Sequence, residues 1–292
     1  MEWVHVMKRC SIKLACAISA LVCLPIHAFA TSLPQRIVSL NLCTDQLVAD
    51  IVSRERLIGV SKLAADPSLS SMSRQFSGVK LLNGTTEEVL NLNPDLVIVS
   101  DTTSAATVEL LRQVGLRVLI VPMASSFESL RANIRAIAVA VGEANVGEAL
   151  ILDFDDRLRS ARSTVASRPT ALAYQVNSLV SGPDSLLDEI LDAAGYHNLA
   201  RDISTGRTGR VPLEALVTHP PDLLVFANAP GDYKTVLADN LRHPALMYVK
   251  SRRPSIVLPM PYWLCATPRI ADAVEMLASM KSSSFANVHR AP

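Results

Sequence analysis

Short apolar runs alternate along the chain with segments in which apolar residues recur at helical spacing. In the first half, runs rich in β-branched residues occur at residues 36–40, 56–60, 95–99 and 117–121. Helices are predicted at residues 45–51, 105–114 and 125–141, the last beginning with the capping-box pattern Ser125-Ser126-Phe127-Glu128. Such alternation is typical of an α/β fold, in which a mostly parallel sheet carries helices on both faces.

The same alternation begins again at Thr170. Strands are predicted at residues 171–176, 222–226 and 255–258, and helices at residues 184–194 and 268–280. Between the halves, residues 144–167 contain no proline and no glycine after Gly147, which predicts one long helix. We therefore expect two similar lobes, residues 31–143 and 169–292, joined by a linking helix within residues 144–168.

One sequence pattern occurs once in each predicted lobe. Residues 87–99 read EEVLNLNPDLVIV, and residues 214–226 read EALVTHPPDLLVF. In both copies a glutamate begins a short helix, a proline ends it, and Asp-Leu leads into an apolar strand. The repeat indicates that the lobes share one fold, and a ligand is most naturally bound between them.

The first 30 residues have the pattern of a secretory signal peptide. Basic residues at positions 8, 9 and 13 precede an apolar run, and Ala28-Phe29-Ala30 forms a small-x-small cleavage site. We expect cleavage after Ala30 and export to the periplasm. Anchoring as a lipoprotein is the weaker alternative, because Lys13 and Leu21 stand where a lipobox needs an apolar and a small residue.

Removal of this peptide leaves 25 basic and 26 acidic residues, a balance that argues against charge-driven binding of nucleic acid. The sequence contains no glycine-rich nucleotide motif, no G-x-S-x-G nucleophile and no H-E-x-x-H zinc motif. No later segment approaches the roughly 20 apolar residues that a membrane-spanning helix needs. We therefore expect a binding protein rather than an enzyme, with no resident metal or cofactor.

This layout resembles the periplasmic substrate-binding proteins of ABC importers. Within that family it resembles the class whose lobes are joined by a helix and which carries cobalamin, ferric siderophores and haem. The motifs that carry the resemblance are residues 36–40, 57–60, 87–99 and 266–270, and the cobalamin-binding members look most similar. The resemblance implies a monomer that captures a small metal chelate between its lobes. It would deliver this ligand to a membrane permease and its ATPase.

By position, the resemblance makes Glu87 and Glu214 the carboxylates that dock into arginine pockets of the permease. A carboxylate at an exposed helix start can accept a bidentate arginine from a partner. Each could instead be an ordinary solvated charge, but the repeat at matched positions favours docking. A ligand-sensing module without an importer would keep the cleft and would not need these glutamates.

Ligand-binding residues are expected in loops after the strands, because open α/β sheets bind ligands at the carboxyl ends of their strands. Tyr262 and Trp263 are interpreted as an aromatic platform, or alternatively as rings packed beneath their loop. Arg269 is the main charged candidate, with a structural role as the alternative. The full predicted set is Asn41, Leu42, Cys43, Leu82, Gln175, Asn177, Tyr262, Trp263, Cys265 and Arg269.

Cys43 and Cys265 are the cysteines that remain after removal of the signal peptide, and both fall in loops predicted to face the cleft. Three interpretations stay open. The oxidising periplasm favours a disulfide if the two Cα atoms approach within about 7 Å. The sulfurs could instead be ligands of a soft metal, or each cysteine could be a small buried hydrophobic residue.

The identity of the ligand also stays open. Residues 62–66 and 81–84 lack the aromatic side chains of the cobalamin-binding pattern. Corrinoid, ferric siderophore and haem therefore remain alternatives.

Overall fold

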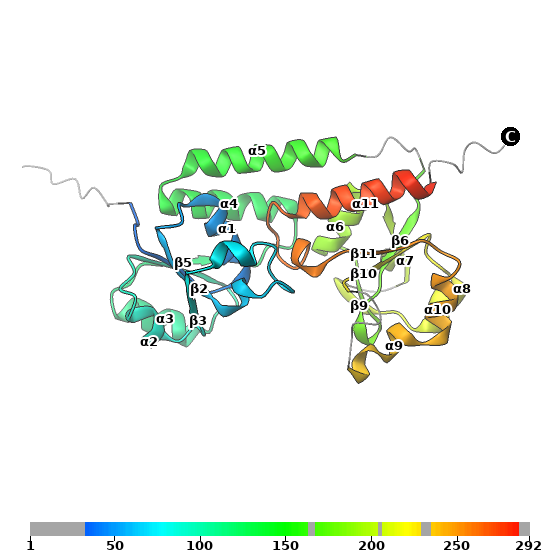
Figure 1. Cartoon of the computed structure of the whole chain (residues 1–292), viewed down its shortest axis with the longest axis horizontal. Coiled ribbons are helices and arrows are strands. Elements are labelled where there is room, and N and C mark those ends of the chain that lie inside the picture. Colours follow the sequence, from blue (N-terminus) through cyan, green and yellow to red (C-terminus); the bar gives the residue numbers. More distant parts are fainter. Residues whose placement is uncertain (1–32, 163–166, 204–205, 229–234, 286–292) are drawn as a thin grey trace, which may run out of the picture. The chain divides into compact units, whose positions relative to one another are not determined.

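The computed structural model describes residues 33–162, 167–203, 206–228 and 235–285 (Figure 1). The predicted signal peptide, residues 1–30, lies outside the described residues, as do residues 163–166 at the end of the predicted linking segment. Residues Leu33–Pro292 form one compact unit, which contains both of the lobes described below.

The N-terminal lobe contains, within the described residues, a five-stranded parallel sheet of order β3-β2-β1-β4-β5. Its strands are β1 Ile37–Ser39, β2 Leu57–Ser61, β3 Lys80–Leu82, β4 Leu96–Ser100 and β5 Val118–Val121. Four of them match the predicted apolar runs to within one residue at either end. The edge strand β3 was not predicted, because three residues are too few to show a period.

Helices cover both faces of this sheet, as predicted. They are α1 Leu42–Ile51, α2 Thr86–Leu90, α3 Ala105–Gln113 and α4 Phe127–Val141, with single turns η1 Lys62–Ala65 and η2 Ser73–Phe76. Alternate residues of a strand point to opposite faces. Ile37 therefore packs with residues of α1 and α4, whereas its neighbour Val38 packs with residues of α2 and α3.

The start of α4 differs by one residue from the predicted capping box. Ser126 is the N-cap residue, and its Oγ accepts a hydrogen bond from the backbone N–H of Ser129 at 3.1 Å. The Oγ of Ser129 accepts the reciprocal bond from the N–H of Ser126 at 3.0 Å. The predicted box of Ser125 and Glu128 was wrong, although the helix that it announced is present.

The C-terminal lobe contains, over the described residues, a four-stranded parallel sheet of order β11-β10-β6-β8. Its strands are β6 Thr170–Ala173, β8 His197–Asn198, β10 Leu223–Phe226 and β11 Ser255–Val257. A small antiparallel pair, β7 Leu179–Ser181 with β9 Thr208–Arg210, was not predicted. The helices are α6 Leu186–Ala193, α7 Ala200–Ile203, α8 Leu213–Thr218, α9 Asp239–Arg242, α10 Pro244–Lys250 and α11 Ile270–Phe285, with turns η3 Val176–Ser178, η4 Val236–Ala238 and η5 Met260–Tyr262.

The aspartate of the repeated Asp-Leu pair makes equivalent hydrogen bonds in both lobes. The carboxylate of Asp95, just before β4, accepts the N–H groups of Gln35 and Arg36 ahead of β1 at 2.7 and 3.0 Å. The carboxylate of Asp222, just before β10, accepts the N–H and Oγ1–H of Thr170 at the start of β6, both at 2.9 Å. Each aspartate thus joins the beginning of one strand to its parallel neighbour. The sequence repeat therefore corresponds to a repeated structure.

The linking helix α5 spans Ala144–Ser160 and is shorter than the predicted segment. It follows α4 after a tight turn at Gly142, whose φ of 79° is in the left-handed region that favours glycine. Arg131 of α4 pairs with Asp155 of α5 at 2.6 Å. Arg157 of α5 pairs with Asp272 of α11 at 2.5 Å, so α5 is attached to helices of both lobes (Figure 1).

Within the described part of the chain, none of the helices combines the length and the apolar character needed to cross a membrane.

Candidate functional site

The segment that follows β11 connects the C-terminal lobe to helix α1 of the N-terminal lobe. A disulfide joins Cys265 in this segment to Cys43 in α1, and their Cα atoms are 5.1 Å apart. The disulfide was one of the three open interpretations. It excludes the other two, in which the sulfurs are metal ligands or the cysteines are separate buried residues. The prediction that both cysteines lie in loops was right for Cys265 only, because Cys43 is the second residue of helix α1.

Asn41 and Cys43 are half-buried at the start of α1, and both make structural contacts there. The Oδ1 of Asn41 accepts the N–H of Cys43 at 2.9 Å and thereby caps α1, and its Nδ2 donates to Ser100 at 3.3 Å. Ala266 closes the small space beside them, leaving a cavity of about 10 Å³. One water molecule needs at least this much room, so this space holds no larger ligand, and the assignment of Asn41 and Cys43 to ligand binding stays a prediction.

Leu42 and Leu82 are core residues rather than ligand contacts. Leu42 is 7% exposed, and Leu82 is 1% exposed and packs with Val38 and Val97 beneath α2 and α3. The strand alternation places the side chain of Leu82 on the inner face and leaves its neighbour Leu81 on the outside. Both leucines are therefore withdrawn from the predicted ligand site.

Arg269 has the structural role that was its alternative. Its Nη2 donates to Oδ1 of Asp50, in the last turn of α1, at 2.9 Å. Burial raises the pKa of Asp50, and the adjacent guanidinium partly offsets this effect. The pair therefore fastens the start of α11 to the N-terminal lobe instead of leaving a free cation in the cleft.

Gln175 and Asn177 are half-buried in the loop after β6. The Nδ2 of Asn240 donates to the carbonyl of Gln175 at 2.8 Å, and its Oδ1 accepts the N–H of Asn177 at 3.1 Å. Their backbones are therefore held by Asn240, which the sequence did not single out. Their assignment to ligand binding stays a prediction.

A cavity of about 510 Å³, here named the strand-end cavity, lies between the lobes where the loops after β2 and β11 meet. Its C-terminal wall contains Tyr262. Its N-terminal wall is a serine-rich segment missed from the sequence. The lining residues are Pro67, Ser70, Ser71, Met72, Ser73, Arg74, Gln75, Pro259, Pro261 and Tyr262.

The two aromatic residues of the predicted platform have separate positions. Tyr262 lines the strand-end cavity. The indole Nε1 of Trp263 donates to the carbonyl of Leu258 at 3.0 Å, and its ring packs against the apolar core. Trp263 therefore holds the loop, whereas Tyr262 packs against the same core and also lines the cavity, so the role of the two rings as a ligand platform stays a prediction.

Arg74 is the charged residue of the strand-end cavity. Its side chain is exposed and makes no ion pair or hydrogen bond with any other described residue. A sequence signal for this wall did exist, since the serine-rich run directly follows the loop expected to face the cleft. It was missed because only residues 62–66 of this region were considered from the sequence.

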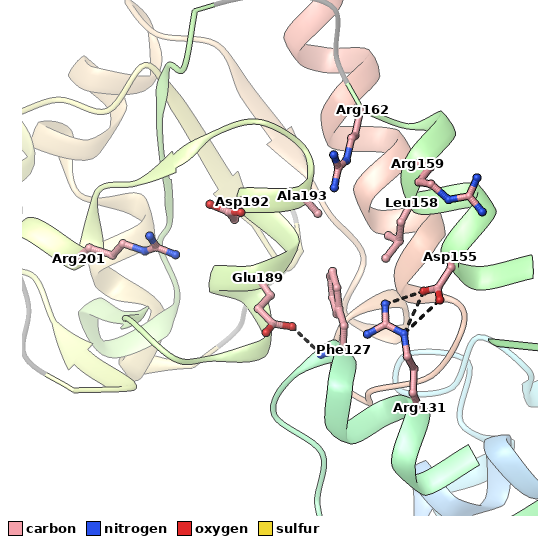
Figure 2. Close-up of a pocket in the computed structure, with 10 residues that line it drawn as sticks. All are labelled: Phe127, Arg131, Asp155, Leu158, Arg159, Arg162, Glu189, Asp192, Ala193 and Arg201. Atoms are coloured by element: carbon pink, nitrogen blue, oxygen red, sulfur yellow. Dashed lines mark hydrogen bonds and ion pairs between the residues drawn. The ribbon is translucent and has the colours of Figure 1, made fainter. Parts of the chain in front are cut away.

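A second cavity, here named the helix-side cavity, has a volume of about 530 Å³ and lies between α4, α5 and α6 (Figure 2). Its charged groups largely satisfy one another. Arg131 pairs with Asp155, and Glu189 accepts the N–H of Phe127 at 2.5 Å. Arg201 pairs with Asp188 at 2.7 Å. Because most charged side chains of this cavity are already paired, the strand-end cavity is the better candidate for a ligand site.

Asp45, in the first turn of α1, is a buried carboxyl group next to Ser61 at the end of β2. It is 0% exposed, and burial raises its pKa from 3.8 to about 8. Its Oδ2 accepts the N–H and Oγ–H of Ser61 at 3.1 and 2.5 Å, whereas its Oδ1 has no partner. An uncharged acid is therefore the stable form in neutral solution. Among the described residues, no group of three His, Cys, Asp or Glu side chains could hold a metal ion.

Glu87 and Glu214 are both exposed and occupy the same position in matching helices. Each is the second residue of its helix, Glu87 in α2 and Glu214 in α8. The adjacent Glu88 is different, because its carboxylate accepts the N–H of Asn83 at 2.8 Å and completes a capping box with Thr85. The hydrogen bond from the side chain of Asn83 lowers the pKa of Glu88.

Two α/β lobes of matching construction, with a cavity between their strand ends, define a solute-binding protein of the two-lobed class. The chain belongs to the periplasmic binding protein family, whose model matches residues 37–250. The expected resemblance is thereby confirmed.

Relatives and solved structures agree with this assignment. A protein of Halobacterium salinarum strain R1 named cobalamin-binding protein is 27% identical over 197 residues, which cover 66% of this chain and 53% of that protein. The uncharacterized ABC transporter substrate-binding lipoprotein YvrC of Bacillus subtilis is 24% identical over 205 residues, covering 66% and 63%. The chain thus spans about half to two thirds of these relatives' length.

The structure of the periplasmic heme-binding protein RhuT from Roseiflexus sp. RS-1 in apo form has a similar fold. It superposes with a TM-score of 0.70 at 24% identity, covering 86% of this chain and 98% of that one. This likeness establishes the two-lobed fold.

Proposed function

We propose that the protein is the periplasmic solute-binding component of an ABC importer and that it carries a corrinoid. In this proposal the ligand occupies the strand-end cavity, and no covalent chemistry takes place. Membership in the periplasmic binding protein family supports the class, and the cobalamin-binding relative in Halobacterium salinarum supports the ligand. The relative YvrC, an ABC transporter substrate-binding lipoprotein, supports the link to an importer.

The observation that carries the transport proposal is the matched exposure of Glu87 and Glu214. Two lobes that each present a free carboxylate at the same helical position can engage a partner with two equivalent arginine pockets. Arginine–carboxylate pairs of this kind are bidentate and directional, so they determine the orientation in which the protein docks.

The lining of the strand-end cavity suits a large ligand with a flat face and one acidic group. The ring of Tyr262 offers apolar surface, the serine-rich wall offers hydroxyl groups, and Arg74 offers an unpaired guanidinium. The phosphodiester of a cobalamin would find its partner in Arg74. Haem and a ferric siderophore are the alternatives. The propionate groups of haem would also accept hydrogen bonds from the guanidinium of Arg74.

Visible absorption tests the ligand assignment. The purified protein is titrated separately with cyanocobalamin, haemin and ferrichrome, and each mixture is passed through a gel-filtration column. We expect the cobalamin chromophore alone to elute with the protein in a one-to-one ratio. Elution of haem or of the iron chelate in its place would replace the ligand, and a colourless protein in all three mixtures would contradict the metal-chelate proposal.

A further inference from the structure

Two bonds fasten the same helix of the N-terminal lobe to the same short segment of the C-terminal lobe. Cys43 and Asp50 are both in α1, seven residues apart, and therefore lie two turns apart on one face. Their partners, Cys265 and Arg269, are four residues apart in the segment between η5 and α11. This segment accordingly lies along α1.

The residues between the two bonds are buried. Ala266 is 5% exposed and Thr267 is 1% exposed, and Pro268 is also buried. Ala266 closes the small cavity at the ends of the N-terminal strands. The contact is therefore packed along its whole length rather than held at two isolated points.

The ion pair at one end is costly to break. The second carboxylate oxygen of Asp50, Oδ2, is buried without a partner, so the interaction with Arg269 is the main compensation for the buried charge. Arg269 is 34% exposed and Asp50 only 9%, so removal of Arg269 leaves a largely buried carboxylate without its cation. The disulfide at the other end joins cysteines 222 residues apart. It holds α1 and the segment after β11 together even if the chain between them moves.

The lobes are also joined along a second, separate line. Arg157 of α5 pairs with Asp272 and Glu275 of α11, at 2.5 and 2.9 Å. Hinge motion needs a few residues about which one lobe rotates as a body. Attachment along α5 and again along α1 opposes such a rotation.

We propose that the two bonds Cys43–Cys265 and Asp50–Arg269 form an interlobe clamp that sets the width of the strand-end cavity, and that reduction of the disulfide loosens it. The use of this cavity for a ligand rests on the proposed function, whereas the clamp itself does not. Reduction transfers two electrons and two protons from a dithiol, the S–S bond becomes two thiols on Cys43 and Cys265, and the dithiol closes to its own disulfide. The clamp thereby makes ligand retention depend on the oxidising environment.

Hydrogen exchange measured by mass spectrometry on the full chain, without ligand, tests the clamp. Samples are compared before and after treatment with dithiothreitol, and a thiol titration confirms two new thiols per chain. We expect exchange in residues 42–51 and 258–269 to become at least about fivefold faster, while β4 and β10 stay protected. Small-angle scattering should show a larger radius of gyration. Unchanged exchange in both segments after complete reduction would overturn the proposal.

Two variants complete the test. Cys43→Ser with Cys265→Ser is the matched control, because it should exchange rapidly from the start and ignore dithiothreitol. Arg269→Gln keeps the disulfide and should give an intermediate increase in the same two segments, so the clamp stays testable even if reduction unfolds the protein. If Arg269→Gln exchanges like the wild type, the ion pair is no part of a clamp and the proposal fails.

Release of bound cyanocobalamin is measured separately in the oxidised and reduced protein. We expect at least about fivefold faster release after reduction, because the lobes no longer hold the cavity at one width. Faster hydrogen exchange in a protein that binds no cyanocobalamin would support the clamp and contradict the corrinoid proposal. Equal release rates in a protein that does bind would overturn the effect of the clamp on the cavity.

Discussion

Glu87 and Glu214 stand at the same position of two matching helices, one in each lobe, and both side chains are exposed. They are 127 residues apart in sequence. Their neighbours differ, since Glu88 is engaged in a capping box and Glu214 is followed by Ala215. What the lobes share at this place is therefore a free carboxylate, which is the part that a partner can recognise.

The double variant Glu87→Gln with Glu214→Gln should abolish uptake and leave ligand binding unchanged. Each glutamine keeps the size of the side chain but removes the charge that a bidentate arginine requires. The measurements are uptake of labelled cobalamin by cells and the dissociation constant of the purified protein. Glu109→Gln, an exposed glutamate of α3, is the matched control and should leave both unchanged. Normal uptake by the double variant would favour a sensing module over an importer component.

Tyr262→Ala should weaken ligand binding about 5- to 30-fold, which corresponds to the loss of about 1–2 kcal/mol of aromatic contact. Trp263→Ala should instead destabilise the protein by about 2–4 kcal/mol, because it removes the bond to Leu258 and packing against the core. Titration and denaturant unfolding separate the two effects. A large loss of affinity in folded Trp263→Ala, with none in Tyr262→Ala, would reverse the assignment of the two rings.

Arg74→Ala should weaken binding of an acidic ligand about five- to tenfold, and the loss should shrink as salt is added, since an exposed ion pair is screened. Isothermal titration at low and high ionic strength gives both quantities. Arg112→Ala is the matched control, because Arg112 is an exposed arginine on α3 outside the strand-end cavity. Equal affinities for Arg74→Ala and Arg112→Ala would show that the ligand makes no contact with Arg74.

The stability of the protein should fall with rising pH because of Asp45. Its pKa is 3.8 as an ordinary side chain and about 8 in the folded protein, so the folded state holds a proton that the unfolded state has released between these values. The contribution of Asp45 is therefore present in full below about pH 4. It is lost progressively as the pH rises from about 4 to about 8.

Urea unfolding of the wild type and of Asp45→Asn at pH 5 and pH 8 measures this effect. All other groups titrate alike in both proteins, so the difference between their pH slopes isolates Asp45. We expect the wild type to lose more stability than the variant between the two pH values. Parallel slopes would mean that Asp45 is ionised in the folded protein.

Local sequence patterns were sufficient to predict the two lobes and most of their strands. Apolar runs of four or five residues predicted four of the five strands in the N-terminal sheet to within one residue. The repeated Glu–Pro–Asp-Leu pattern predicted that the second lobe is built like the first. These features are local, because burial of a strand depends on the composition and spacing of its own residues. For the same reason the amino-acid sequence alone was enough to match Glu87 with Glu214.

The roles of the loops, in contrast, depend on how the lobes pack together. Cys43 and Cys265 are 222 residues apart, and whether their sulfurs meet depends on how the segment after β11 packs on α1. That packing pairs Arg269 with Asp50 and places Arg74, the serine-rich wall and Tyr262 around one cavity. Such contacts join elements that are distant in sequence. The periodicity of apolar residues along the chain does not predict which loops will face each other.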